Sequence, residues 1–167
     1  MPEPMTIRSF DPSLDLGWAS ELLDIEFGGR MQVRRGEPMD ALEGSGLVAA
    51  RGPQRIGLVT WFMDIASASA EIRSVVLIPD ARGQGLGGTV VQAAHDRLRE
   101  AGARRAWLVT TNDNLRALAL YQRLGYRLAA LRAGAVDEAR RTIKPAIPEI
   151  GEHGIPIRDE LELEILL

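Results

Sequence analysis

The stretch Pro79-Asp-Ala-Arg-Gly-Gln-Gly-Leu-Gly-Gly88 joins an apolar run typical of a strand to an amphipathic run typical of a helix. Glycines let a backbone approach an anion closely, and the first amides of a helix are free to donate hydrogen bonds to it. Arg82 adds a permanently charged, planar fork of donors. We therefore expect this loop to bind phosphate groups.

The kind of nucleotide is constrained by the surroundings of the glycines. Gly83, Gly85 and Gly88 satisfy the dinucleotide pattern G-x-G-x-x-G, which keeps an NAD-binding protein as one hypothesis. That pattern should directly follow the first strand and be followed about 20 residues later by an acidic residue, and neither condition holds here. A phosphate loop of the Lys-Ser or Lys-Thr type also fails, because no lysine follows the glycines.

Hydrophobic periodicity divides the rest of the chain into short alternating elements, which indicate a single α/β domain over residues 1–167. Period-2 alternation predicts strands at 6–10, 46–51, 56–64, 71–78, 104–111, 126–133 and 158–167. Helical spacing predicts helices at 14–27, 86–101 and 115–124, and a further helix over 30–42 that is broken near Gly36 and Pro38. The connection over 134–157 is unusually long, with a short charged helix and three prolines, and such loops tend to serve function.

Composition excludes several classes of protein. The 167 residues contain no cysteine, which removes disulfides, thiolate nucleophiles and cysteine-based metal sites. A net charge of -3 argues against nucleic acid as a partner. No apolar run is long enough to cross a membrane and no signal peptide precedes the first strand, so we expect a soluble, cytoplasmic protein. In the last strand Glu160, Glu162 and Glu164 share one face, which should meet solvent or a basic neighbour.

Three motifs carry a family resemblance. Arg82-Gly-Gln-Gly85-Leu-Gly87 fits the pattern R/Q-x-x-G-x-G/A, and Val75-Val-Leu-Ile-Pro79 precedes it as a strand. The helix after the next strand reads Asn114-Leu-Arg-Ala-Leu-Ala-Leu-Tyr121-Gln-Arg-Leu-Gly-Tyr126. With these motifs the chain resembles the GCN5-related N-acetyltransferases, the GNAT family. The detailed likeness covers about the middle third of the chain.

The resemblance implies a fold and a cofactor. The fold is a mixed, mostly antiparallel sheet of six to seven strands with about four helices and a splayed pair of strands at the cofactor site. Acetyl-CoA would lie with its pyrophosphate on the loop amides and its pantetheine arm along the splayed strand, where it hydrogen-bonds like an added strand. The residues implied in cofactor binding are Val75, Val76, Leu77, Arg82, Gly83, Gln84, Gly85, Leu86, Gly87, Gly88, Asn114 and Tyr121.

Two residues are candidates for proton transfer. An alkylammonium must lose a proton before it attacks, and Glu71 occupies the position where several GNAT enzymes place a general base. By period 2, Glu71 should face the same way as Val75 and Leu77. The span from Glu71 to Val75 is about 13 Å, so we expect the proton to travel through water. Tyr121, two turns after the Asn114 cap, is the candidate acid for the leaving thiolate, on family precedent.

The acceptor pocket is the least determined part. In the family its walls come from the break after the first helix and from the segment before the last strand, which makes Phe27, Arg30, His153 and Arg158 candidates for substrate binding. Two distant histidines without a third ligand do not argue for a metal.

Four functions follow as hypotheses. The first is transfer of acetyl from acetyl-CoA to a primary amine of a small molecule, directly and through a ternary complex. The second has a protein lysine or N-terminus as the acceptor, and an open groove between Phe27 and His153 would favour it. The third is a non-catalytic acyl-CoA binding module, and the fourth is the NAD-binding protein. A homodimer is common in the family, and the apolar last strand is its only hint in this sequence.

Overall fold

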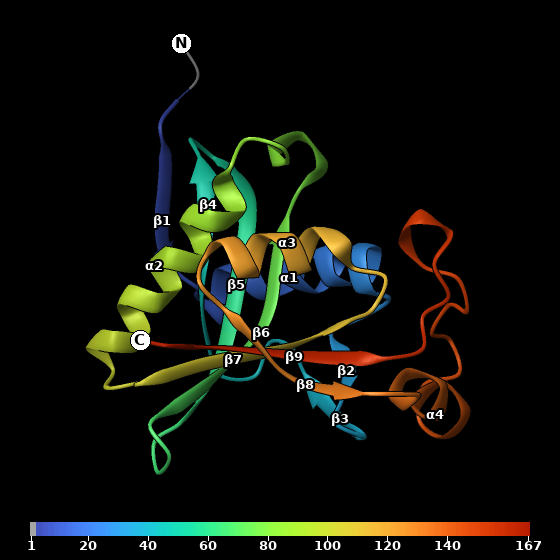
Figure 1. Cartoon of the computed structure of the whole chain (residues 1–167). Coiled ribbons are helices and arrows are strands. Elements are labelled where there is room, and N and C mark those ends of the chain that lie inside the picture. Colours follow the sequence, from blue (N-terminus) through green and yellow to red (C-terminus); the bar gives the residue numbers. More distant parts are fainter. Residues whose placement is uncertain (1–2) are drawn as a thin grey trace.

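A seven-stranded sheet forms the centre of the protein in the computed structural model, which describes residues 3–167 (Figure 1). The strand order is β1-β4-β5-β6-β7-β9-β8, and every neighbouring pair is antiparallel except β6 and β7. The strands are β1 (Met5–Ser9), β4 (Ser45–Arg51), β5 (Gln54–Asp64), β6 (Ser69–Leu77), β7 (Arg105–Thr111), β8 (Arg127–Arg132) and β9 (Glu160–Leu166). The mixed, mostly antiparallel sheet expected from the sequence is confirmed.

Helices cover both faces of this sheet. Figure 1 shows α2 (Leu86–Glu100) and α3 (Leu115–Arg123) on one face and α1 (Pro12–Phe27) on the other. Val90, Ala94 and Leu98 of α2 are fully buried against the sheet, as the apolar stripe predicts, and Leu23 of α1 is buried on the opposite face. Each of these three helices, and each of the seven strands, lies within two residues of its predicted bounds at both ends.

The helix predicted over residues 30–42 is wrong, because this segment is a β-hairpin. Its strands β2 (Met31–Arg34) and β3 (Glu37–Asp40) form a separate two-stranded sheet. Arg35 and Gly36 both have positive φ, 52° and 79°, which is the backbone of a two-residue turn between paired strands. A proline at position 38 also removes the amide that a helix would need there.

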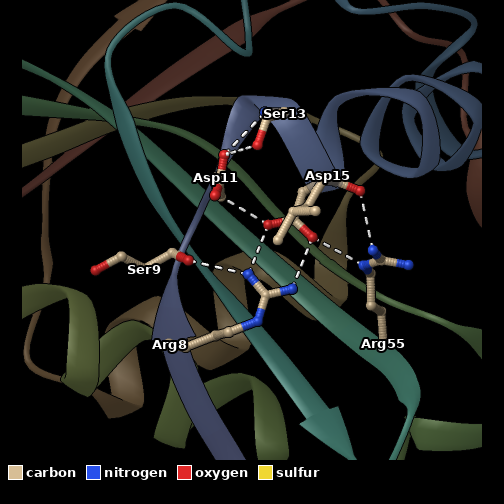
Figure 2. A network of polar contacts seen from close by, with 7 residues as sticks. Arg8, Ser9, Asp11, Ser13, Asp15 and Arg55 are labelled. Carbon is tan, nitrogen blue, oxygen red and sulfur yellow. Dashed lines mark hydrogen bonds and ion pairs between the residues drawn. The ribbon is translucent and has the colours of Figure 1, made fainter.

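Helix α1 is fixed to the sheet by a buried carboxylate (Figure 2). Asp15 is fully buried and accepts hydrogen bonds from both terminal nitrogens of Arg8 on β1, at 2.6 and 2.7 Å. Arg55 on β5 donates to the same carboxylate at 2.8 Å. These hydrogen bonds hold the pKa of Asp15 well below its usual range. The first turn of α1 is thereby bonded to two strands.

The segment 134–157 folds over the other end of the sheet. It contains α4 (Ala135–Thr142) and a turn of 3₁₀ helix at Glu152–Gly154. Arg140 holds it together by donating to the carbonyl oxygens of Ile147, Pro148 and Ile157, each at 2.8–2.9 Å. The long connection is thus an ordered segment that the hydrogen bonds of Arg140 hold in place.

The glutamates of β9 meet a basic neighbour, one of the two outcomes expected. Glu162 is buried, with only 4% of its surface exposed. It forms ion pairs with Arg35, Arg105 and Arg132, which come from three different parts of the chain. These cations hold the pKa of Glu162 below its usual range despite its burial.

Candidate active site

The glycine loop ends at the first turn of α2 with its amides unoccupied by any side chain. Gly83 and Gly85 have φ of 74° and 75°, a left-handed backbone that favours glycine. Gly85 is the N-cap of α2, and no side chain of the described residues accepts a hydrogen bond from this helix start. The first amides of α2 therefore present donors and the positive end of the helix dipole, which fits the pyrophosphate that the sequence motif implies.

Arg82 and Gln84 are held by neighbouring elements. The Nε of Arg82 donates to the carbonyl of Leu77 at 3.0 Å, and its Nη2 pairs with Glu26 at the end of α1 at 2.5 Å. Gln84 donates to the carbonyl of Asp80 and accepts from Arg51, which ties the loop to the end of β4. Arg82 thus links the loop to α1 and remains a predicted phosphate contact.

The pair β6 and β7 splays apart, as the resemblance implies. The two strands pair in parallel only from Ser69 opposite Arg105 to Glu71 opposite Trp107. Beyond this point the β7-facing edge of β6 has no strand partner in the described part of the chain, while its other edge stays paired with β5 through Leu77. Free backbone donors and acceptors along this edge fit an extended pantetheine arm that adds like a strand.

A β-bulge in β6 corrects the predicted orientation of Glu71. The register with β5 shifts between Thr60, opposite Ser74, and Trp61, opposite Ile72. The unpaired Arg73 reverses the alternation, because a bulge adds one residue to one strand only. Ile72 therefore packs in the same core as Val75 and Leu77, while Glu71 faces the β2–β3 side of the sheet. The prediction that Glu71 faces the same way as Val75 and Leu77 is wrong.

Glu71 is nearly buried and paired on this side. Its exposed fraction is 9%, and its carboxylate accepts from the Nε of Arg73 at 3.2 Å. Arg73 also pairs with Glu43 and lies over the ring of Phe62. Glu71 borders a cavity of about 430 Å³ whose other walls are the β2–β3 hairpin and Trp107. Its role as a base stays a prediction.

Tyr121 presents its hydroxyl from a buried ring. The ring is 6% exposed and packs edge-on against Tyr126, with centroids 5.2 Å apart. The Tyr126 hydroxyl is hydrogen-bonded to Nε2 of His95 at 2.7 Å, whereas the Tyr121 hydroxyl makes no hydrogen bond within residues 3–167. Burial raises the pKa of Tyr121 above its usual value, so the phenol keeps its proton at neutral pH.

A cavity of about 520 Å³ lies beside the end of β7, on the α1 side of the sheet. Its walls come from the C-terminal turn of α1, from β2, from β7 with the start of α3, and from the segment 134–157. Asn114 and Phe27 line it, and Asn114 also caps α3 by accepting from the amide of Ala117. This volume is typical of a pocket for a small molecule.

The four predicted substrate residues are distributed unequally around this cavity. Phe27 forms part of the wall. Arg30 does not line it and is paired with Asp40 through two hydrogen bonds. His153 and Arg158 lie near the wall residues Glu152 and Ile157 without lining the cavity themselves. Of these four residues, the structure therefore places only Phe27 in the cavity wall, and all four roles stay predictions.

Sequence reasoning missed several charged residues of the cavity. Arg34 and Lys144 line it, together with the acids Asp24, Glu26, Asp113, Glu152 and Glu160. Asp113 is buried and accepts from the hydroxyl of Thr111 and the amide of Glu152, which fixes the wall to β7. The one available signal was that Lys144 is the only lysine in a chain that otherwise uses arginine.

Comparisons with known proteins agree with this geometry. Residues 17–126 match the model of the acetyltransferase (GNAT) family. The chain belongs to the GNAT family. The protein YdhI of Bacillus subtilis strain 168 is 38% identical over 122 residues, which cover 73% of this chain and 72% of that one. Streptothricin acetyltransferase of Streptomyces lavendulae is 32% identical over 81 residues, or 46% of this chain and 43% of that one.

A solved structure supports the fold. A GNAT acetyltransferase from Elizabethkingia anophelis with acetyl-CoA bound has a TM-score of 0.74 at 18% identity, and the likeness covers 98% of each chain. As a member of the family, the protein is an acetyltransferase that uses acetyl-CoA, and the free amides of α2 and the open edge of β6 fit this cofactor.

Residues 3–167 contain neither a cluster of metal ligands nor a membrane-spanning helix. Among residues 3–167, no three histidine, aspartate or glutamate side chains are grouped so that they could hold a metal ion. None of the described helices is long and apolar enough to cross a membrane.

Proposed function

We propose that the protein transfers the acetyl group of acetyl-CoA to a primary amine of a small molecule, directly and within a ternary complex. The observation that carries this proposal is the 520 Å³ cavity, which adjoins the end of β7 on the splayed side of the sheet. A pocket of this size suits a small molecule, whereas a protein substrate requires an open groove. Five carboxylates line the cavity against two cations, which favours a positively charged amine.

The acceptor nitrogen must lose two protons, one before it attacks and one as the tetrahedral intermediate collapses, and the leaving sulfur must gain one. Acetyl-CoA supplies an activated thioester when bound. The acceptor nitrogen forms the new N–C bond, and the C–S bond breaks. Glu71 would take the proton of the ammonium through water, since its carboxylate borders the adjoining cavity and not the large one. Tyr121 would donate its hydroxyl proton to the leaving sulfur, and the second proton of the acceptor nitrogen would return through water to the phenol.

Backbone groups would stabilise the transition state. The unpaired edge of β6 beyond Glu71 offers amides near Leu77 that could donate to the oxyanion of the tetrahedral intermediate. Because the chain has no cysteine, no thioester to the enzyme can form, and direct transfer to the amine is the consistent path.

A protein acceptor is the second candidate. It draws support from a sequence relative, the ribosomal protein bS18 alanine acetyltransferase of Escherichia coli, which is 33% identical over 38% of this chain. Residues of the segment 144–157 form one wall of the 520 Å³ cavity, and a walled pocket of this size favours the small-molecule acceptor.

A competition among acceptors tests the proposal. Release of the CoA thiol is followed with acetyl-CoA and, in turn, with diamines, amino acids, amino sugars and peptides that carry either an internal lysine or an N-terminal alanine. We expect kcat/KM to be at least tenfold higher for one of the small amines than for any peptide. Turnover with peptides alone would contradict a small-molecule acceptor, and binding of acetyl-CoA with no turnover would favour the non-catalytic module.

A further inference from the structure

Arg34 is a half-buried cation without a carboxylate partner among residues 3–167. It stands at the end of β2 and lines both the 520 Å³ and the 430 Å³ cavities. Within residues 3–167, the only hydrogen bond of its side chain runs from Nη1 to the carbonyl of Val33, at 2.9 Å. The guanidinium forms no ion pair there. The nearby arginines differ, because Arg30, Arg35 and Arg73 are each paired with an acid.

The acids closest to Arg34 are already engaged elsewhere. Glu71 accepts from Arg73, and Glu160 accepts from the amide of Arg35 at 3.2 Å. Their charges partly stabilise the Arg34 guanidinium, but burial outweighs them and lowers the pKa of Arg34. A desolvated guanidinium with unused donors gains strongly from an anion that reaches it.

Lys144 brings a second positive charge to the same cavity. Its Nζ donates to the carbonyl of Met31 at 3.0 Å, which places the ammonium against β2. Burial lowers the pKa of Lys144, and the charge of Arg34 lowers it further, so the two cations lie close enough to repel each other. An anion between them would relieve both the repulsion and the loss of hydration.

We propose that Arg34, assisted by Lys144, binds the carboxylate of the acceptor, which is therefore a compound that carries both a primary amine and a carboxylate. This inference rests on the proposed function and names its substrate class. The planar fork of a guanidinium matches a carboxylate through two parallel hydrogen bonds. The acids on the remaining wall of the cavity, Asp24, Asp113 and Glu152, would attract the ammonium end of the same molecule.

The test compares acceptors that differ only in the anionic group. Glycine, alanine, leucine, methionine and 4-aminobutanoate are each assayed beside their carboxamides, with CoA release as the readout. The amine of an α-amino amide is less basic than that of the amino acid, so a larger fraction of it is uncharged and reactive at pH 7.5. This difference in intrinsic reactivity favours the carboxamide and works against the expected result. We expect kcat/KM to be at least tenfold higher for the best carboxylate than for its carboxamide.

Variants then show which side chain causes the preference for the carboxylate over the carboxamide. In Arg34→Gln we expect kcat/KM for the carboxylate to fall about 10- to 100-fold, the size of a lost charge-assisted contact, while the carboxamide is little affected. Arg34→Lys should recover part of the loss, and Lys144→Met should show a smaller one. Arg127→Gln is the matched control, because Arg127 is exposed on the edge strand β8 and forms no ion pair within residues 3–167.

The outcomes separate this inference from the proposed function. Equal or better turnover of the carboxamides, or a carboxylate preference that survives in Arg34→Gln, overturns the role of Arg34 while acetylation of small amines stands. If the diamines and amino sugars are acetylated but no amine of either series is, the role of Arg34 is overturned while the proposed function stands. If no small amine at all is acetylated, the proposed function fails, and the anion site is judged by thermal melting with the N-acetylated carboxylates and carboxamides. A carboxylate-specific rise in melting temperature that Arg34→Gln abolishes supports the site, and its absence overturns it.

Discussion

At the residue scale, Tyr121 combines a buried ring with a hydroxyl that has no partner in the described chain. We predict that Tyr121→Phe lowers kcat about 100-fold or more, because the leaving thiolate loses its acid, while KM for acetyl-CoA changes little. Burial raises the pKa of Tyr121, so its protonated, donating form persists as the pH rises. The pH profile of kcat should therefore show no loss from this group between pH 7 and 10.

Tyr126→Phe provides the control for Tyr121→Phe. It removes a phenol of the same kind, but one whose hydroxyl is bonded to His95. We expect a loss of stability of about 1 kcal/mol with turnover retained. A Tyr121→Phe enzyme as active as the Tyr126→Phe enzyme would contradict the role of Tyr121.

Glu71 and Glu43 form a second matched pair, since each is an ion-pair partner of Arg73. We predict that Glu71→Gln lowers kcat by at least 100-fold, because a carboxamide cannot accept the proton of the ammonium. Glu43→Gln should stay close to the wild type, because Glu43 is exposed and Arg73 keeps its ion pair with Glu71. Similar rates for the two variants, measured by CoA release, would remove Glu71 from the mechanism.

The sequence predicted which residues form this site better than it predicted the direction in which their side chains point. The glycine loop was predictable from the sequence, because several glycines with an arginine directly before a helix are typical of an anion-binding loop. The orientation of Glu71 was not readable, because the bulge at Arg73 carries no residue signature and period 2 assumes an unbroken strand. Arg34 was missed because its lack of an ion pair is a property of the packed chain.

At the element scale, α1 depends on the carboxylate of Asp15 for its attachment to β1 and β5 (Figure 2). We predict that Asp15→Asn lowers the free energy of unfolding at pH 7 by about 2–3 kcal/mol, because two half-exposed arginines lose their shared anion. Since α1 carries Phe27 and Glu26 into the cavity wall, activity at 37 °C should fall with it. Urea unfolding measures the change.

The pH dependence of the free energy of unfolding of the same variant gives a second check on the role of Asp15. The pKa of Asp15 is lowered in the folded protein, so its contribution is complete above the unfolded value of about 3.9 and is lost as the pH falls below it. The difference between the wild type and Asp15→Asn should therefore stay constant down to about pH 4 and narrow as the pH falls from about 4 to about 2. Asp96→Asn is the control, because Asp96 is exposed and forms only a surface ion pair with Arg99. A constant difference across this range would contradict the ion-pair account.

Elements were predictable where one periodicity ran without interruption. The strands of the main sheet and the three long helices follow period 2 or 3.6 and were predicted within two residues. The hairpin of β2 and β3 was mistaken for a helix because its strands are four residues each, too short to show a period. Its turn at Arg35-Gly36 was the signal that could have revealed it.

At the scale of the whole molecule, ligand binding to the loop and the splayed strands should stabilise the folded state. Acetyl-CoA at 100 times its dissociation constant adds about 2.7 kcal/mol, which for a chain of this size raises the melting temperature by about 5–10 °C. NAD at the same concentration should have no such effect. Thermal melting with each ligand makes the comparison, and stabilisation by NAD alone would restore the dinucleotide hypothesis.

The 520 Å³ cavity lies at the end of β7, the strand that parts from β6, and the proposed mechanism has both substrates bound together there. Initial rates measured over a matrix of acetyl-CoA and amine concentrations test this claim most directly. Direct transfer predicts amine-dependent CoA release with intersecting double-reciprocal lines, because both substrates bind before any product leaves. Parallel lines would reveal a covalent acetyl-enzyme and would contradict the account.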